Sequence, residues 1–208
     1  MAVTFNPLAA AFIAATALTR LPGCRAGKFP ATAICCLVVA LSGCTTGKPG
    51  TTHRPYSVYA DTTVGFARSV RSNAPRGGRA YGLVEITFHP DYKLVPGERG
   101  CSTQVKDVGL ELVVILPQWR DGKPVPGPVK PRWRRFYQTV NAHEDSHIRI
   151  ARDYALRMRQ ALARMRSKTS CSDLQGQINK RVVQIKAQHL RAHGRFDARD
   201  MKRLKSLI

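Results

Sequence analysis

Acidic side chains are scarce in this sequence of 208 residues, which holds 13 Asp and Glu against 34 Lys and Arg, a net charge of +21. None of the acidic residues falls in the first 44 residues, whose only basic residues are Arg20, Arg25 and Lys28. The rest of the chain therefore carries 31 basic and 13 acidic residues, a balance of +18. So strong a bias implies an anionic neighbour.

The sequence also lacks a long apolar run near its basic start. The segment FPATAICCLVVALSGC, which follows Lys28, is shorter than the roughly 20 apolar residues that a membrane span needs. A basic flank, about a dozen apolar residues and a small-residue exit are typical of a secretory signal. Its last four residues, Leu41–Cys44, resemble the bacterial lipobox, in which the chain is cut before a lipid-bearing cysteine.

We therefore expect residues 1–44 to form a signal and Cys44 to carry the lipid anchor; a plain signal peptide cut nearby, or an uncleaved anchor, is the alternative. Thr45, and not Asp, follows this cysteine. In a Gram-negative cell the expected location is then the outer membrane, facing the periplasm, with secretion as the other route.

Cysteine is rare after the signal, because four of the six cysteines lie in the first 44 residues and only Cys101 and Cys171 remain. In an exported domain, two cysteines most simply form one disulfide, and two free buried thiols are the alternative. For the anionic neighbour, export favours lipopolysaccharide or anionic lipid. Nucleic acid is not expected, because the basic residues scatter over the sequence without a recognition motif.

The chain after the signal divides by composition. Residues 45–55 are rich in Gly, Pro and Thr and are expected to be a polar tether. Residues 56–208 are expected to form one domain. It begins with YSVYA as a short strand and TTVGFARSVRSNAP as a short helix, followed by the strand RAYGLVEITFH. A strand or hairpin in STQVKDVGLELVVILPQW and a Pro/Gly-rich loop over 120–131 come next.

Helical periodicity replaces the strand pattern after this loop. One amphipathic helix is predicted over about 132–167, and a second begins near Ser172. The predicted fold class is α+β, a small antiparallel sheet followed by a two-helix antiparallel hairpin. The apolar stripe of the first helix is Trp133, Phe136, Val140, His143, His147, Ala151, Tyr154, Met158 and Leu162.

The stripe includes the motif H-E-x-x-H at His143, Glu144 and His147. Four residues advance a helix by about 6 Å and about 400°, so both imidazoles point to the same side. Two such nitrogens can share one Zn²⁺, and Glu144 is placed to accept a proton from the zinc-activated water. Two hydrogen-bonded core histidines are the alternative, but two inward histidines with Glu directly after the first favour zinc.

A catalytic zinc usually has three protein ligands. Asp153 is rejected, because on a continuous helix it lies about 240° round from His147. Folding the chain back near Thr169 sets His147 opposite His193 and His143 opposite Asp197. The third ligand is therefore predicted to be Asp197 or His193, with His189 still open.

The ordered motifs resemble a bacterial family of unknown function, domain of unknown function 922, described as predicted secreted zinc-dependent proteases. The likeness covers about residues 56–197. It rests on YSVYADTT, SNAP, the Gly-Cys pair, VVILPQW, HEDSH, Ser-Cys and Phe-Asp. It implies a zincin-like site at His143 and His147 with Glu144 as general base, export, and pairing of the two cysteines. Family members often continue to a His-Gly that this chain lacks. If that histidine is a ligand in relatives, this chain either uses Asp197, Asp200 or His193 in its place or binds metal poorly.

Two functions follow as hypotheses. The first is an envelope-anchored zinc metallopeptidase that hydrolyses peptide bonds of a peptide or protein substrate. The second is a non-catalytic basic lipoprotein that binds anionic cell-envelope polymers and keeps a vestigial or structural zinc site. Glu144 favours the first, because a purely structural site needs no general base.

Overall fold

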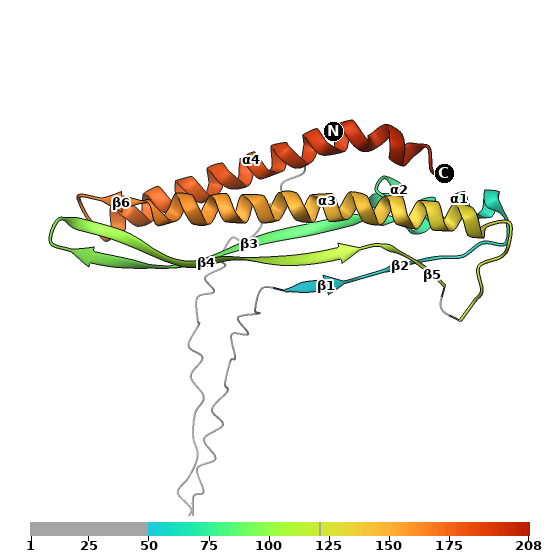
Figure 1. Cartoon of the computed structure of the whole chain (residues 1–208), viewed down its shortest axis with the longest axis horizontal. Coiled ribbons are helices and arrows are strands. Elements are labelled where there is room, and N and C mark those ends of the chain that lie inside the picture. The colour runs from blue at the N-terminus through green and yellow to red at the C-terminus, as the bar shows by residue number, and fades with distance from the viewer. Residues whose placement is uncertain (1–49, 121) are drawn as a thin grey trace, which may run out of the picture. The chain divides into compact units, whose positions relative to one another are not determined.

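The computed structural model describes residues 50–120 and 122–208, which belong to one compact unit. The expected signal, its Cys44 and residues 45–49 of the expected tether lie outside the described residues. Within this part of the chain the fold is mixed α/β, with a small sheet and four helices, so the predicted class is confirmed at that level (Figure 1). None of the described helices is long and apolar enough to cross a bilayer.

A long antiparallel hairpin forms most of the sheet. Strand β3 (Leu83–Gly97) pairs with β4 (Gly100–Ile115), from Leu83 opposite Ile115 to Gly97 opposite Gly100, with one register shift between Asp91 and Tyr92. The strands are rich in Val, Ile, Leu and Thr, residues that fit a pleated, half-buried surface. β3 also contains two prolines, which an edge strand tolerates because its outer N–H groups need no partner.

The sheet is not antiparallel throughout, which corrects the expectation of an antiparallel sheet. β1 (Thr51–His53), in the segment expected to be a tether, pairs parallel with β4, and β6 (Arg166–Ser167) pairs antiparallel with β4. β2 (Tyr56–Val58) and β5 (Pro117–Trp119) form a separate parallel pair. These parallel pairings join segments far apart in the sequence, so no local turn signal announces them.

Two short helices precede the hairpin. The helix α1 (Thr63–Asn73) begins at Thr62, whose hydroxyl accepts a hydrogen bond from the Gly65 N–H. α2 (Pro75–Gly78) is a single turn with left-handed backbone. Gly78 has a φ of 79°, and a Cβ there would lie 2.2 Å from the Arg71 carbonyl oxygen. Only glycine fits this close approach, which turns the chain back toward β3.

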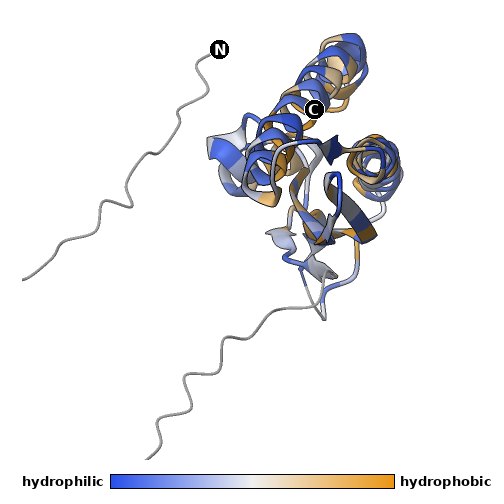
Figure 2. Ribbon diagram, turned by 90° about the vertical axis from the view of Figure 1, so that its left-hand side faces the viewer, coloured by the Kyte–Doolittle hydropathy of each residue, from blue (hydrophilic) through white to orange (hydrophobic). Residues whose placement is uncertain are grey.

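Two long helices complete the fold. α3 (Lys130–Ala163) and α4 (Cys171–Lys205) are joined by a short connection that contains β6. The predicted first helix ends four residues too late, because the chain leaves the helix to form β6. Ser170 caps α4 by accepting a hydrogen bond from the Asp173 N–H. Each helix has hydrophobic and hydrophilic sides, as the colours in Figure 2 show, so each packs through one face.

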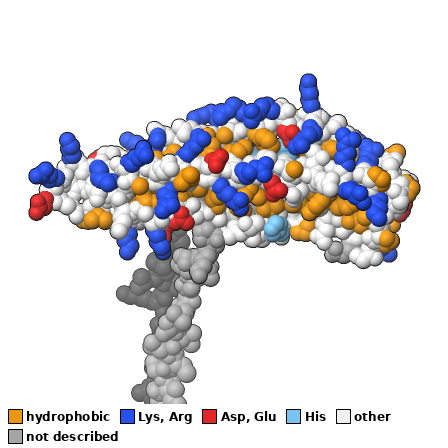
Figure 3. All heavy atoms as spheres, in the orientation of Figure 1, with side chains coloured by type: hydrophobic (Ala, Val, Ile, Leu, Met, Phe, Trp, Pro, Cys, Tyr) orange, Lys and Arg blue, Asp and Glu red, His pale blue; other side chains and the backbone are white. Residues whose placement is uncertain are grey.

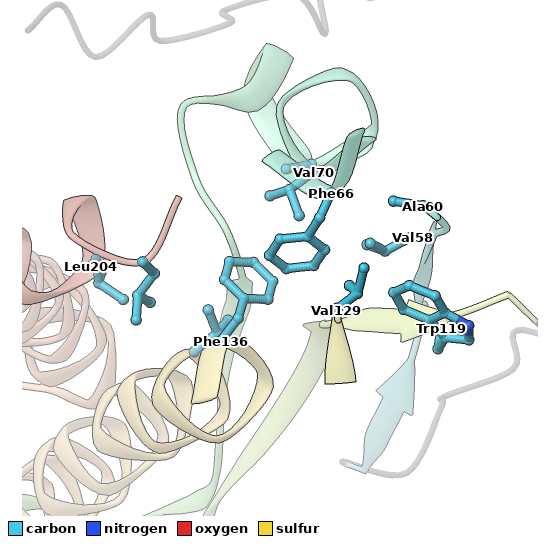
Figure 4. Packing of buried hydrophobic residues seen from close by; sticks show 11 residues of the cluster. Val58, Ala60, Phe66, Val70, Trp119, Val129, Phe136 and Leu204 are labelled. Carbon is cyan, nitrogen blue, oxygen red and sulfur yellow. The ribbon is translucent and has the colours of Figure 1, made fainter. Parts of the chain in front are cut away.

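The buried apolar side chains form two clusters. In the first, the rings of Phe66 from α1 and Phe136 from α3 meet edge to face with centroids 5.4 Å apart (Figure 4). In the second, Met158 and Leu162 of α3 join Leu174 and Ile178 of α4, each fully buried. Burial of such a side chain stabilises the folded state by about 1.5–3 kcal/mol relative to leaving it exposed. The His143–His147 segment of α3 lies in sequence between the residues of these two clusters.

The predicted disulfide is confirmed. Cys101 in β4 and Cys171 at the start of α4 are bonded, with their Cα atoms 5.0 Å apart. This bridge fixes the start of α4 against the sheet and so helps to set where the rest of α4 lies along α3.

Candidate metal centre

Helix α3 presents the two motif histidines toward α4. His143 and His147 are 5% and 7% exposed, on the same side of the helix as the buried Val140 and Ala151. Their Nε2 atoms face each other at 3.1 Å, and the two rings meet nearly perpendicular. The spacing of four residues produces this pairing, since the helix turns about 400° between them.

Helix α4 adds a carboxylate to the two imidazoles. One oxygen of Asp197, Oδ1, lies 2.9 Å from Nε2 of His147 and 3.3 Å from Nε2 of His143. The three side chains are the group in the described residues that could hold a metal ion. The side chain of Asp197 is 44% exposed, whereas the histidine side chains are almost covered. Solvent therefore reaches the group on the Asp197 side.

The geometry of the three donor atoms fits a small tetrahedral ion. Their separations are 2.9, 3.1 and 3.3 Å. Ligand atoms of a tetrahedral zinc at about 2.0–2.1 Å are about 3.3–3.4 Å apart, so the ion would need them to separate by only a few tenths of an ångström. Two imidazole nitrogens and a carboxylate oxygen are also donors that zinc accepts.

A second carboxylate orients the first histidine. Nδ1 of His143 donates a hydrogen bond to Oδ2 of Asp200 over 2.7 Å, and the same oxygen accepts a hydrogen bond from Arg203 at 2.8 Å. A ring that donates from Nδ1 has its Nε2 lone pair free for a metal when the ring is neutral. Asp200 is thus placed behind His143, away from the three converging donors.

The charges of these groups depend on one another. Burial would lower the pKa of His143, but hydrogen bonds with Asp197 and Asp200 raise it above its usual value. Burial would raise the pKa of Asp197, yet hydrogen bonds from His143 and His147 bring it well below its usual range. Asp197 is therefore ionised at neutral pH, as a metal ligand must be.

Rings of α4 stack on the imidazoles of His143 and His147. Phe196 stacks on His143 with ring centroids 4.8 Å apart, and His193 stacks on His147 at 4.4 Å. His193 was one of two residues predicted for the third ligand position. The structure instead lays its ring face to face on His147, and its buried Nε2 has no hydrogen-bond partner among the described residues.

Glu144 lies beside the histidines and is almost completely buried, at 4% exposed. Burial raises its pKa to about 7, and this rise persists although His147 and His143 lower the pKa. Gly82, directly before β3, makes room for it, because a Cβ there would lie 2.6 Å from Oε1 of Glu144. The Glu144 carboxyl therefore occupies a tight pocket between α3 and the strand.

Another histidine of α4, His189, lies next to His193 and beyond the candidate centre. His189 lies 4.1 Å from His193, ring centre to ring centre, and its other neighbours are Phe88 and Tyr154. Burial and the charge of His147 lower the pKa of His189 to about 4, and burial with the charges of the other histidines does the same for His193. These two histidines are therefore neutral at pH 7.

Sequence reasoning located most of this arrangement. The motif residues and Asp197 come together, and Asp153 is exposed and apart, as argued from the helical angle. The stacking of Phe196 and the role of Asp200 behind His143 were missed. Their signal was present, because His193, Phe196, Asp197 and Asp200 are spaced by three, one and three residues, which puts them on neighbouring faces of one helix.

Fold and site together define a class: a mixed α/β protein with a candidate His₂Asp metal centre between two antiparallel helices. The chain belongs to the family described as bacterial protein of unknown function (DUF922), whose model matches residues 53–203. No curated protein matches the chain, and no solved structure matches it.

Proposed function

We propose that this protein is a zinc-dependent metallopeptidase with a zincin-like centre. The observation that carries the proposal is the convergence of Nε2 of His143, Nε2 of His147 and Oδ1 of Asp197 within 3.3 Å of one another. Three protein ligands with a fourth position left for water are typical of catalytic zinc, whereas structural sites usually take four. A bound zinc ion supplies a Lewis acid that acidifies water and polarises a carbonyl group.

The residues of the chain have separate tasks in this proposal. His143, His147 and Asp197 bind the ion, and Asp200 orients His143 through Nδ1. Glu144 follows His143 directly in the motif and is the general base, which takes a proton from the attacking water and passes it to the leaving amine. The substrate approaches over Asp197, because that side chain is the exposed member of the group.

The burial of the base supports a catalytic role. Keeping a carboxylate 4% exposed, in a pocket that excludes even a Cβ at Gly82, costs free energy that a surface glutamate would not. A structural zinc site has no use for this group. We therefore favour catalysis over a purely structural centre.

The experiment compares Glu144→Gln with the wild type and with Glu98→Gln, a matched change at the exposed tip of the β3–β4 hairpin. We expect Glu144→Gln to bind zinc as the wild type does but to lose peptide hydrolysis by roughly 10²-fold or more. Glu98→Gln should change neither. Zinc content would be measured by elemental mass spectrometry and turnover with a mixed peptide library.

Two results would contradict the proposal. Purified protein that takes up no zinc would remove the metal centre. Protein that binds zinc but cleaves no peptide in the library would favour the structural alternative, a zinc site that serves the fold of a basic lipoprotein.

A further inference from the structure

The outward side of α4 carries an unbalanced positive charge. After Gln175 this helix contains nine Lys and Arg and two Asp. Both aspartates, Asp197 and Asp200, pair with histidines of α3, and Asp200 also pairs with Arg203. The nine basic residues are all exposed: Lys180, Arg181, Lys186, Arg191, Arg195, Arg199, Lys202, Arg203 and Lys205. Figure 3 shows Lys and Arg side chains along the upper edge of the molecule, where Figure 1 places α4.

Part of this charge forms a straight ridge. At about 100° per residue, Arg191, Arg195 and Lys202 lie within about 40° of one another around the helix. None of the three side chains has a hydrogen bond or ion pair within the part of the chain that the structure describes. Unpaired charges in a row repel one another, so an anionic partner on this side would relieve the repulsion.

Beside the ridge, α4 exposes its two large apolar residues that do not pack inward. Val183 and Leu190 are 65% and 66% exposed. They lie seven residues apart, which places them within about 20° of each other and about 110° from the ridge. Gly194 continues this side, and a Cβ there would meet no atom within 4 Å. One outward face therefore combines basic side chains with aliphatic ones.

This combination is that of a helix which lies in a membrane interface. Basic side chains there are attracted to anionic lipid headgroups, and aliphatic side chains enter the acyl boundary. Single-stranded nucleic acid would instead call for exposed aromatic rings on which bases stack. Among Phe, Tyr and Trp, α4 contains only Phe196, which is stacked on His143, and the rings of His189 and His193 pack against other rings.

We propose that the outward face of α4, from Lys180 to Lys205, docks on the surface of an anionic lipid bilayer. Asp197 lies about 10 Å along the helix from Leu190 and about 20° round from it. Docking therefore places the exposed side of the candidate metal centre next to the headgroups. The docking itself does not depend on the proposed hydrolysis.

The test for the charges uses the full chain and vesicles of phosphatidylglycerol with phosphatidylcholine, beside vesicles of phosphatidylcholine alone. The measured quantity is the ratio of the two partition coefficients. A contribution of the first 44 residues is common to all variants and cancels when the ratio of a variant is divided by that of the wild type. Arg191→Gln with Arg195→Gln and Lys202→Gln should lower this ratio about 100-fold, since each basic residue near such a surface contributes roughly fivefold.

The matched control removes the same charge elsewhere. Arg68→Gln with Lys93→Gln and Arg99→Gln changes three exposed basic residues outside α4, and it should lower the ratio only severalfold. Equal losses for both triple variants, or a wild-type ratio near one, would overturn the proposal. So would tighter binding to a DNA duplex than to the anionic vesicles at the same salt concentration.

The apolar contribution has its own pair of variants. Val183→Ser with Leu190→Ser should lower partition into the anionic vesicles about tenfold, because two aliphatic side chains leave the acyl boundary. Val64→Ser with Leu156→Ser, at positions that are 70% and 53% exposed on α1 and α3, should leave it unchanged. No difference between these two pairs would show a surface that binds by charge alone and would overturn docking on a bilayer.

Discussion

Two pairs of histidines with the same spacing lie side by side in this protein and have different surroundings. His143 and His147 on α3 converge on the carboxylates of Asp197 and Asp200. His189 and His193 on α4 face rings, and the Nε2 atom of each is buried without a hydrogen-bond partner among the described residues. Spacing by four residues sets two imidazoles on one side of a helix, but it is the facing carboxylate that makes a candidate metal centre.

The difference in protonation follows from the same contrast. The pKa of His143 is raised, because hydrogen bonds with two aspartates outweigh burial. The pKa values of His189 and His193 fall to about 4, because burial is not compensated. A metal that binds Nε2 of His143 would therefore have to displace a proton, whereas the α4 pair acts as packing surface that stays neutral at pH 7.

The disulfide that fixes the start of α4 against the sheet stabilises the fold that holds both pairs. Replacing Cys101 and Cys171 together by Ser should lower the free energy of unfolding by roughly 4 kcal/mol, because the bridge closes a long loop in the unfolded chain. Denaturant titration of the two proteins would measure this. The zinc affinity of the folded variant should stay within tenfold of the wild type, and an unchanged midpoint would contradict a stabilising bridge.

Single substitutions should distinguish the two pairs of histidines by their effect on zinc affinity. His147→Ala removes one of three donors and should weaken zinc binding by about 10² or more, since structural zinc binding of 10–16 kcal/mol averages roughly 3 kcal/mol per ligand. His193→Ala removes the ring stacked on His147 and leaves all three donors in place, so its effect should stay below about tenfold. Competition with a zinc chelator would measure both constants, and equal losses would make His193 a ligand after all.

The dependence of folding stability on pH should distinguish the α4 pair, His189 and His193, from the α3 pair. The unfolded chain protonates His189 near its ordinary pKa of about 6.5, and the folded chain does so only near about 4. Its contribution to stability is therefore complete above pH 6.5 and is lost as the pH falls toward 4. Between pH 7 and pH 4.5 the metal-free wild type should lose about 2–3 kcal/mol more than His189→Phe, which has no proton to take up.

This pH dependence is measured by denaturant unfolding at a series of pH values. The surroundings of His189 include His193 and Tyr154, with His147 as the nearby charge. Parallel stability curves for wild type and variant would show that the fold does not lower the pKa of His189, and would remove the distinction between the pairs.

The smallest expected effect concerns the residue behind His143. Asp200→Asn keeps the size of the side chain but weakens the hydrogen bond with Nδ1, so zinc affinity should fall by about 10–100-fold. Asp173→Asn, near the opposite end of α4, is the control and should leave the affinity unchanged. If Asp200→Asn also leaves it unchanged, Asp200 has only a structural role at the helix end.

Local sequence patterns predicted a large part of this picture. The stripe of α3 and its inward histidines follow from a period of 3.6 residues, which a single helix determines by itself. Counting back from the break between the helices also predicted that His147 meets His193 and His143 meets Asp197, and both contacts occur. The parallel pairings of β1 and β2 were not predicted, because their partners lie about 60 residues away in the sequence.

The sequence by itself determined that α3 carries two imidazoles and a glutamate on adjoining faces, since helix geometry fixes those directions from spacing alone. Only the tertiary structure decided that Asp197, and not His193, reaches both Nε2 atoms, and that Asp200 orients His143. The physical reason is the register of α4 against α3. If α4 slipped by one turn along α3, about 5.4 Å, the ring of His193 would take the place of the Asp197 carboxylate. The register is set jointly by the disulfide, the short connection between the helices and the packing of the buried side chains.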